Sequence, residues 1–345
     1  MLLIYNRNLE RIGKIETFES LFWKEYYQDV GAIRLVAFAT DENIRLLKEG
    51  HRVWQVGKNT SMMLKSVDRD SQPGLIHAFG DSAIARLKER YVLTRIDTVN
   101  AEQGMINIVT NELRGLSRLN IAPPQGFADG FESSYFRVNV FNAVQSLAVG
   151  AGLGFRMFFD GQTDQSQGRD VFQVYRGRNF TGGAGAIRFA DNLGTLPQVR
   201  VIEDSSIYKN VAIVAGSGEG EDRTVIIVGD AQGDDRREVF IDARDIQRRD
   251  GESQADYEGR LYARGRERLN DRPFIRSVSS SIEAPTFGVE FDLGDQVLCR
   301  STKFDIEFIL RTAGFEWIVE GVKTKTTVIF GEPSITIFDE MRLEE

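Results

Sequence analysis

The sequence contains few of the residues that build metal sites, disulfides and catalytic triads. Its 345 residues include one cysteine and two histidines. A lone cysteine cannot form an internal disulfide, which predicts folding in a reducing compartment. No His-x-x-x-His or Cys-x-x-Cys spacing occurs, so the sequence indicates neither a zinc site nor a histidine-based triad. We expect Cys299, His51 and His77 to be ordinary strand residues, because fold positions outnumber site positions.

Long apolar runs and long charged blocks are also absent. The N-terminus lacks the basic start and apolar core of a secretory signal, and no apolar run approaches the ~20 residues that a membrane-spanning helix requires. The net charge of −8 disfavours avid, sequence-independent binding to nucleic acid. With 41% hydrophobic and 27% charged residues, the chain is predicted to be globular and water-soluble, with two or more domains.

The first 97 residues are predicted to form one compact β unit. Apolar residues at helical spacing predict a short helix after Thr17: Phe18, Leu21, Phe22 and Tyr26. Alternation of apolar and polar residues predicts four strands: 31–39, 51–57, 61–69 and 75–80. A turn capped by Asp41 and closed by Gly50, and a helix from Asp81, complete the unit. Strands in such close succession indicate a small barrel or sandwich closed by a helix.

Periodicity divides the remainder of the chain into three further ranges. Residues 98–150 are predicted to be α-rich, with helices at 101–114 and 138–149. Residues 151–277 form an α+β range with five expected strands: 152–160, 170–177, 186–191, 209–216 and 223–229. A helix opens there at Ser253, with an apolar stripe and a one-turn Asp256–Arg260 pair. Residues 278–345 are expected to be a strand meander: 278–284, 291–300, 306–313, 315–327 and 334–341.

Two segments far apart in the chain resemble each other. EGHRVWQV (49–56) followed by SMMLKSVDRD is similar to LGDQVLCR (293–300) followed by EWIVEGVKTK. Each has a glycine at the strand entrance and a valine three positions later. The similarity hints at two related small barrels at the two ends of the chain.

Signals for catalysis are weak. The glycine-rich loops at 181–185 and 215–223 are not followed by a helix or a lysine, so they indicate turns and not phosphate cradles. Asp160, Asp164 and Asp170 cluster near one loop and leave a glycoside-hydrolase pair open as an alternative. Gly-x-Ser-x-Gly is absent. We therefore predict a binding or assembly protein and not an enzyme, with no catalytic residue, no metal and no cofactor.

Several segments, taken in order, resemble the siphophage tail-hub family, the trimeric proteins at the tail tip of non-contractile phages. They include GAIRLVAF, LLKEGHRVWQV, GLGFRMFFD, IRFADNLG, NVAIVAGSGEGEDR, EVFIDARDI and FGVEFDLGDQVLCR, and together span nearly the whole chain. The resemblance implies an α+β, β-rich fold: two small tail-tube-like β-barrel domains at the chain ends (1–97 and 278–345) with intervening α/β domains (98–150 and 151–277). The residues of the matching motifs are given structural roles: Leu47, Gly50, Asp242, Arg244, Leu293, Gly294 and Asp295.

The resemblance also implies a function. Three chains with two similar barrels each would present six units, which lets a threefold tail tip match a sixfold tail tube and line the channel for DNA and the tape measure protein. The implied partners are further copies of the chain, distal tail or tail-tube proteins, the tape measure protein and tip fibre or receptor-binding proteins, with DNA only in transit and no membrane. The implied location is the tail tip of the virion, after assembly in the host cytoplasm.

Two alternatives stay open at this point. One is a tail-associated peptidoglycan hydrolase that uses carboxylates such as Asp160 and Asp170. The other is a carbohydrate-binding tip protein whose candidate aromatics are Trp23, Trp54 and Trp317, although core packing is the favoured role of all three. Because the chain stops at Glu345, soon after the last expected barrel strands, we expect a minimal hub that leaves wall digestion and adhesion to other proteins.

Overall fold

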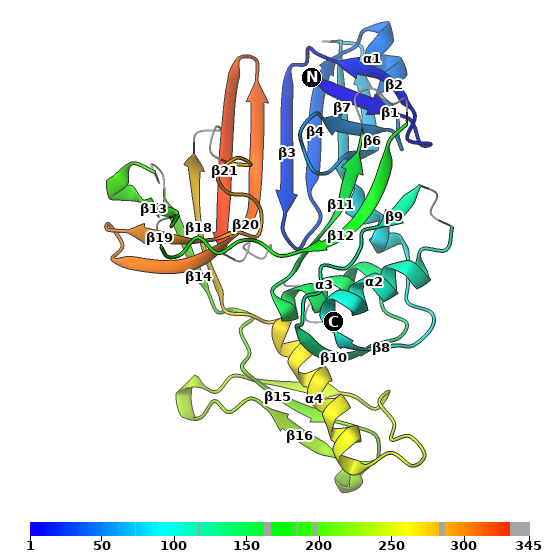
Figure 1. Ribbon diagram of the computed structural model, residues 1–345, viewed down its shortest axis with the longest axis vertical. Helices are drawn as coiled ribbons and strands as arrows, with labels where there is room; N and C mark the ends of the chain where they lie inside the picture. Colours follow the sequence, from blue (N-terminus) through cyan, green and yellow to red (C-terminus); the bar gives the residue numbers. More distant parts are fainter. Residues whose placement is uncertain are drawn as a thin grey trace.

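The computed structural model describes residues 1–331 except for 73, 116–117, 162–166, 184, 196–198 and 283–286. A tall sheet forms the upper part of the molecule, a helical layer lies below it, and a small module with α4 forms the base (Figure 1). Strand accounts for 43% of the chain and helix for 20%, so the predicted β-rich α+β class is confirmed. The predicted two-barrel arrangement is not confirmed, because no closed barrel is found among the described residues.

The large sheet contains thirteen strands from both ends of the chain. The N-terminal strands are β1 (Leu2–Tyr5), β2 (Arg11–Ile15), β3 (Ser20–Tyr26), β4 (Ala32–Phe38), β5 (Arg52–Gln55), β6 (Met62–Asp70) and β7 (Leu75–Ser82). The later strands are β13 (Arg188–Ala190), β14 (Arg200–Asp204), β18 (Ile275–Ile282), β19 (Gln296–Ser301), β20 (Ile306–Glu320) and β21 (Lys323–Gly331). One apolar core, with fully buried Trp23, Leu35 and Phe330 among its members, runs under both groups.

The predicted helix after Thr17 is wrong. Ser20–Tyr26 form strand β3, in which Leu21, Trp23 and Glu25 alternate as buried residues. The strand is hydrogen-bonded on both edges, to β4 and to β20. The helical spacing of the apolar residues was therefore outweighed by pairing with two neighbouring strands, one of them almost three hundred residues away in the chain.

Two other local predictions need correction, and a third cannot be compared with the structure. The turn at 41–46 is the helix α1 (Asp41–Leu46), and it is capped by Thr40, whose side chain accepts from the N–H of Asn43, and not by Asp41. The strands predicted at 306–313 and 315–327 are instead the single long strand β20 followed by β21. The strand predicted at 334–341 lies outside the described residues.

The helical layer has its own apolar core. It contains η1 (Ala83–Glu89), α2 (Ala101–Glu112), α3 (Val140–Ala151) and the strands β8 (Ile96–Asn100), β9 (Leu119–Ile121), β10 (Gly130–Tyr135), β11 (Gly154–Asp160) and β12 (Arg169–Tyr175). Asn100 and Asn139 cap the two α-helices by accepting from backbone N–H groups two or three residues on, and Gly152 ends α3 in the left-handed region. Both predicted helices of this range are confirmed.

The small module is inserted between β14 and β18. It consists of β15 (Val211–Ala215), β16 (Val225–Val228), β17 (Glu238–Asp242) and α4 (Gln254–Asn270), with Tyr257 and Leu261 in its core. Ser253 caps α4, as predicted, by accepting from the N–H of Asp256. The predicted Asp256–Arg260 pair is wrong, because Arg260 binds Glu252 at 2.6 Å instead. The division of the chain at 97, 150 and 277 stays a prediction.

Candidate functional site

Two halves of the large sheet repeat the same strand order. In the first half the order is β3-β4-β7-β6-β5, and in the second it is β14-β18-β21-β20-β19. All the pairings within each half are antiparallel. We call these five-strand groups the N unit and the C unit. In the C unit the small module lies between β14 and β18, whereas the equivalent strands of the N unit, β3 and β4, are joined by a short turn.

The two units carry the same irregularity at the same place. The Gly50 N–H donates to the Leu64 carbonyl, and the Leu64 N–H donates to the carbonyl of His51, the residue after the glycine. The Gly294 N–H donates to the Thr312 carbonyl, and the Thr312 N–H donates to the carbonyl of the following residue. Gly50 and Gly294 have φ values of 80° and 91°. Both are therefore glycine bulges of the type in which the first residue must adopt the left-handed conformation.

A second irregularity fixes the correspondence residue by residue. The β6–β7 register shifts between Leu64 and Ser66, and the β20–β21 register shifts between Thr312 and Gly314. Leu64 thus corresponds to Thr312, in agreement with the bulges. These bonds confirm the predicted similarity of 49–56 with 293–300. The second half of the predicted alignment is wrong, because residues 61–70 correspond to 309–318 and not to 316–325 (EWIVEGVKTK).

The units join through a continuous seam. Strand β3 of the N unit pairs with the outer part of β20 of the C unit over seven residue pairs, with Trp23 opposite Trp317. The strands stand side by side in Figure 1. On the face away from the core, Lys24 and Glu316 form an ion pair of 2.9 Å across the seam. Sequence patterns did not predict this contact, because local periodicity carries no information about a partner so distant in the chain.

A buried carboxylate lies at the seam. Glu25 is 6% exposed, and its Oε1 accepts from the Trp23 indole N–H at 2.6 Å. Burial raises the pKa of Glu25, and the charge of nearby Lys58 opposes part of that change. Lys58 stacks over the rings of Phe315 and Trp317, and burial lowers the pKa of its ammonium.

Glu25→Gln is expected to be more stabilising at pH 8 than at pH 4. Because the pKa of Glu25 is raised in the folded state, the unfolded chain loses its proton first as pH rises above about 4.5, and the wild type then loses stability. Glutamine does not titrate. Thermal unfolding of both proteins from pH 4 to 8 tests this, and a melting-temperature difference that shrinks as pH rises contradicts it.

One tyrosine connects the sheet to the helical layer and to the C unit. A methyl group added at Gly154 or at Gly294 would lie about 2 Å from the Tyr27 ring, so both glycine backbones pack directly against it. The Tyr27 hydroxyl donates toward the carbonyls of Gly152 and Tyr175, at 3.2 and 3.3 Å. Gly294 is therefore needed twice, for its left-handed backbone and for this close approach.

The seven residues with predicted structural roles fall in two places. Leu47, Gly50, Leu293, Gly294 and Asp295 lie at the two bulges, and Leu47, Leu293 and Asp295 are buried. Asp295 accepts from the backbone and guanidinium of Arg178, both at 2.7 Å, which ties the segment after β12 to the C unit.

Asp242 and Arg244 lie apart from these, on the small module. The Arg244 guanidinium donates to Asp242 at 2.8 Å, and Arg223 also binds this carboxylate. Hydrogen bonds from both arginines lower the pKa of Asp242 to about 2. The sequence places these two residues in the motif EVFIDARDI, apart from the motifs that contain the bulge residues, and the fold also keeps the two groups apart.

The carboxylates considered for hydrolysis do not face each other. Asp160 lies opposite Arg169 in the β11–β12 ribbon, and Asp170 lies opposite Phe159, so the two aspartates point to opposite faces. Asp160 binds Arg169 at 2.6 Å. Asp170 is fully buried and accepts from Arg52 at 2.8 Å, with Arg86 at 3.5 Å. Asp164 lies outside the described residues.

The other candidate side chains are mostly part of the core. Trp23 and Trp54 are 0% and 8% exposed, and Trp317 packs against the core that contains Trp23. Cys299 is buried, and burial raises the pKa of its thiol to about 12. Within the described part of the chain, no cluster of His, Cys, Asp and Glu side chains is arranged to hold a metal ion. No described helix has both the length and the apolar character needed to cross a bilayer.

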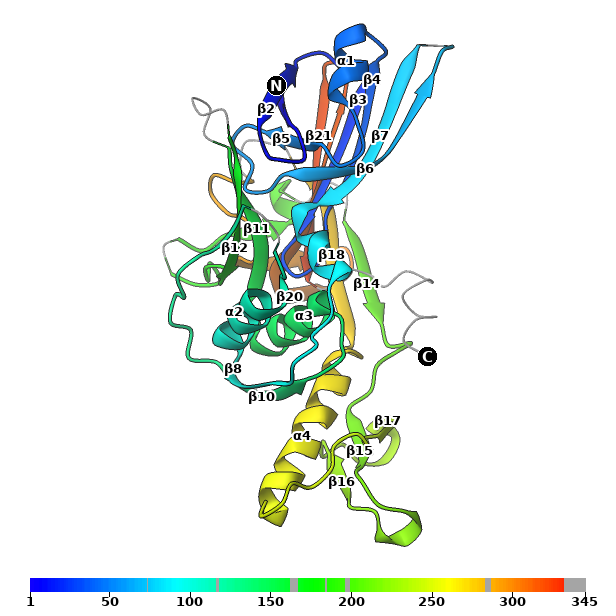
Figure 2. The same cartoon turned by 90° about the vertical axis from the view of Figure 1, so that its right-hand side faces the viewer.

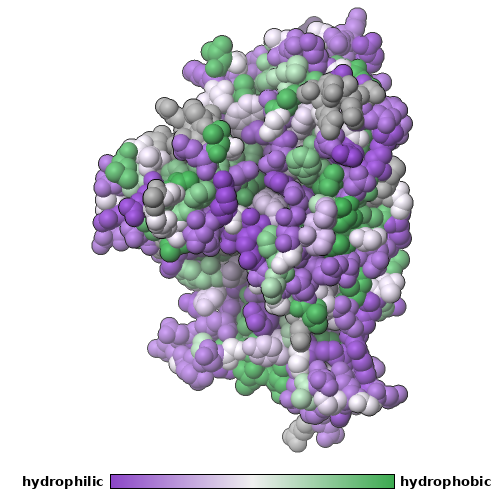
Figure 3. Space-filling model, viewed as in Figure 1, coloured by the Kyte–Doolittle hydropathy of each residue, from purple (hydrophilic) through white to green (hydrophobic). Residues whose placement is uncertain are grey.

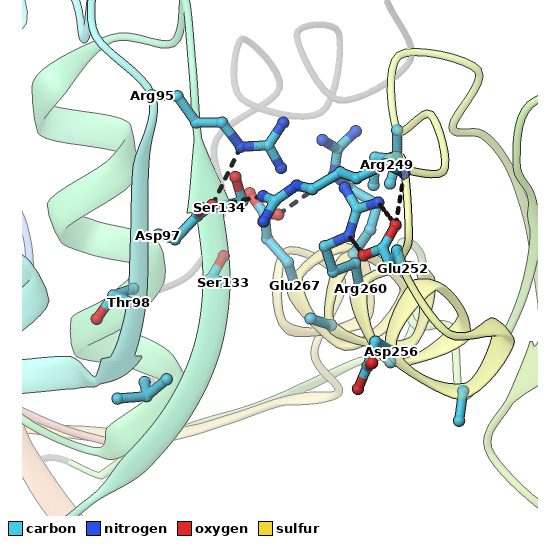
Figure 4. A pocket seen from close by; sticks show the side chains of 16 residues that line it. Arg95, Asp97, Thr98, Ser133, Ser134, Arg249, Glu252, Asp256, Arg260 and Glu267 are labelled. Carbon is cyan, nitrogen blue, oxygen red and sulfur yellow. Dashed lines mark hydrogen bonds and ion pairs between the residues drawn. The ribbon is translucent and has the colours of Figure 1, made fainter.

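A cleft of about 410 Å³ lies where α4 meets β8 and β10 (Figure 4). Its charged side chains bind one another: Arg249 and Arg95 contact Asp97 at 3.0 and 3.1 Å, and Arg260 contacts Glu252. One of these ion pairs, Arg249 with Asp97, joins the small module to the helical layer. The face of the molecule in Figure 3 is mostly hydrophilic, with apolar atoms in small separate areas.

Comparison with known proteins identifies the family of the chain. The family model of siphovirus ReqiPepy6 Gp37-like proteins matches residues 1–332. The chain belongs to this family. The resemblance to siphophage tail proteins predicted from the sequence is confirmed. No curated protein matches the sequence.

Solved structures of tail proteins share the fold of this family member. A tail protein from Neisseria meningitidis MC58 is 11% identical, with 96% of each chain covered and a TM-score of 0.58. The 43 kDa tail protein of prophage MuSo2 from Shewanella oneidensis is 12% identical, with 95% of this chain and 97% of that chain covered and a TM-score of 0.60. Prophage tail protein gp18 from Listeria monocytogenes EGD-e is 12% identical, with 99% and 98% covered and a TM-score of 0.56.

Proposed function

We propose that the protein is the structural hub of a phage tail tip, a homotrimer whose N and C units together form a ring of six similar units. The observation that carries this proposal is the repeated strand order with glycine bulges at equivalent positions. Two similar units per chain let three chains present six similar surfaces, which is what a threefold tip needs to meet a sixfold tube. Membership of a tail protein family supports the same role.

In the proposed ring, units of neighbouring chains would pair edge to edge, as the two units of one chain do at the seam. Within one chain, β3 and β20 already join the two units edge to edge. A ring of units joined in this manner leaves no edge between units unpaired, which removes a route to uncontrolled strand pairing. We propose that closure takes place between copies in the tail and that neighbouring tail-tube, tape measure and fibre proteins bind the finished ring.

The face of the sheet away from the core is the proposed channel lining. It carries ion pairs between Lys24 and Glu316, at 2.9 Å, and between Lys65 and Asp81, at 3.0 Å. Paired charges of both signs give little net attraction for a polyanion. DNA could therefore pass without being held, although the lining is mixed in charge and not uniformly negative.

A hydrolase is the weaker alternative. Asp160 and Asp170 point to opposite faces of their ribbon, and each is bound to arginine, so they cannot flank one glycosidic bond. A carbohydrate-binding role loses support in the same way, because Trp23 and Trp54 are buried. We infer that the protein acts through assembly and not through catalysis.

Mass measurement tests the proposal. Sedimentation velocity over a wide range of protein concentrations is expected to show a species of about three times the chain mass of 38.9 kDa. Addition of the neighbouring tail-tube protein should shift the equilibrium toward the trimer, by mass action. A chain that remains monomeric at every concentration, alone and with that neighbour, contradicts the proposed hub.

A further inference from the structure

Among the described strands, the repeated units leave two strand edges without a partner. At one end of the sheet, β14 pairs only with β18 among the described strands. Strand β5 pairs with one edge of β6 only at Met62 and Met63. Beyond Leu64, no described strand lies along this edge of β6. Figure 2 shows the β6–β7 hairpin projecting beyond its neighbours.

Inside the chain the equivalent edges are joined. Strand β14 occupies in the C unit the place that β3 occupies in the N unit, and β6 occupies the place of β20. The intrachain seam is the pairing of β3 with the outer part of β20, directly after the bulge. The unpaired edges of β14 and β6 are thus the two halves of a second seam that one chain cannot close by itself.

We propose that β14 of one copy pairs antiparallel with the outer part of β6 of the next copy, residues 66–70. The proposal rests on the proposed ring and specifies how its subunits meet. The partner of each edge is a second copy of this chain, because the equivalent edges, those of β3 and β20, already pair with each other inside the chain.

The internal correspondence fixes the register. Gly314 pairs with Tyr26 in the intrachain seam. Gly314 corresponds to Ser66, because each is the first paired residue after the register shift of its strand. When the register is followed from there across the sheet, through β7 and β4 in the N unit and through β21 and β18 in the C unit, Tyr26 corresponds to Asp204. The proposed pairs are therefore Ser66–Asp204, Val67–Glu203, Asp68–Ile202, Arg69–Val201 and Asp70–Arg200.

Charges on the two edges agree with this register. Asp70 and Arg200, both exposed, would lie directly opposite each other. Arg69 would lie diagonally across from Glu203, which is also exposed. Opposite charges at these positions stabilise strand pairs.

A cross-linking experiment tests the pairing. The full chain with Asp68→Cys and Ile202→Cys, positions directly opposite in the proposed register, should give covalent dimers and trimers after mild oxidation. The matched control, Asp68→Cys with Asp204→Cys, places the cysteines on a diagonal at about 7–8 Å, too far for a disulfide. Cys299 is buried and common to both variants. Equal cross-linking of the two variants overturns the proposed register.

Charge reversal provides a second test that does not require a disulfide. Asp70→Arg alone, or Arg200→Asp alone, should raise the concentration at half-assembly by about fivefold, and the double reversal should restore it. If the wild type is a trimer but the charge reversals have no effect and the cross-link is not selective, the strand pairing is overturned and the proposed hub remains. A wild-type chain that never trimerises overturns the hub itself.

Discussion

Asp170→Ala is expected to lower the free energy of unfolding by about 3–5 kcal/mol. Asp170 is fully buried and accepts from Arg52, which is 2% exposed, and from Arg86. Its removal leaves a guanidinium buried without its counter-ion, between β5 of the sheet and β12 of the helical layer. Because Arg52 lies in the sheet and Asp170 and Arg86 lie in the helical layer, the loss should also loosen the contact between the two layers.

The adjacent aspartate provides the control. Asp160 binds Arg169, whose side chain is 56% exposed, so Asp160→Ala should change the free energy of unfolding by about 1 kcal/mol or less. Urea unfolding of both variants, followed by tryptophan fluorescence, measures the difference. Equal losses in the two variants would mean that the Asp170 network does not stabilise the fold.

Gly294→Ala is expected to cost about 2–4 kcal/mol. The backbone of Gly294 has φ of 91°, and a methyl group there would meet the Tyr27 ring at about 2 Å. The substitution therefore combines an unfavourable backbone with a clash at the point where the N unit, the C unit and the helical layer meet.

Gly57→Ala separates the two causes. Gly57 has a similar φ of 89°, but no atom lies within 4 Å of the added methyl group. It should therefore cost only the backbone term of about 1–2 kcal/mol. If thermal unfolding shows the same loss in both variants, close packing against Tyr27 contributes nothing.

Local patterns in the sequence predicted most of the helices and strands. Helical periodicity at 101–114 and 138–149 and the apolar stripe of α4 identified the helices, because a helix is specified by residues that are neighbours in the chain. The repeat around Gly50 and Gly294 was visible for the same reason. Its second half was misaligned because the β19–β20 hairpin is longer than the β5–β6 hairpin.

The seam and the buried polar groups could not be predicted in this way. The pairing of Trp23 with Trp317, and the contact of Asp170 with Arg52, join residues that are far apart in the chain. The insertion of the small module between β14 and β18 further hid the order of the C unit. Glu25, a buried acid within β3, also weakened the strand pattern that would have revealed the strand.

Electron microscopy of the assembled particle, viewed along its axis, tests the central claim most directly. If the N and C units are structural equivalents, averaged images of the protein bound to its tail-tube neighbour should show six similar lobes in a ring built from three chains. Images with three lobes of one kind and no second set, or with copies that do not surround a common axis, would contradict the account.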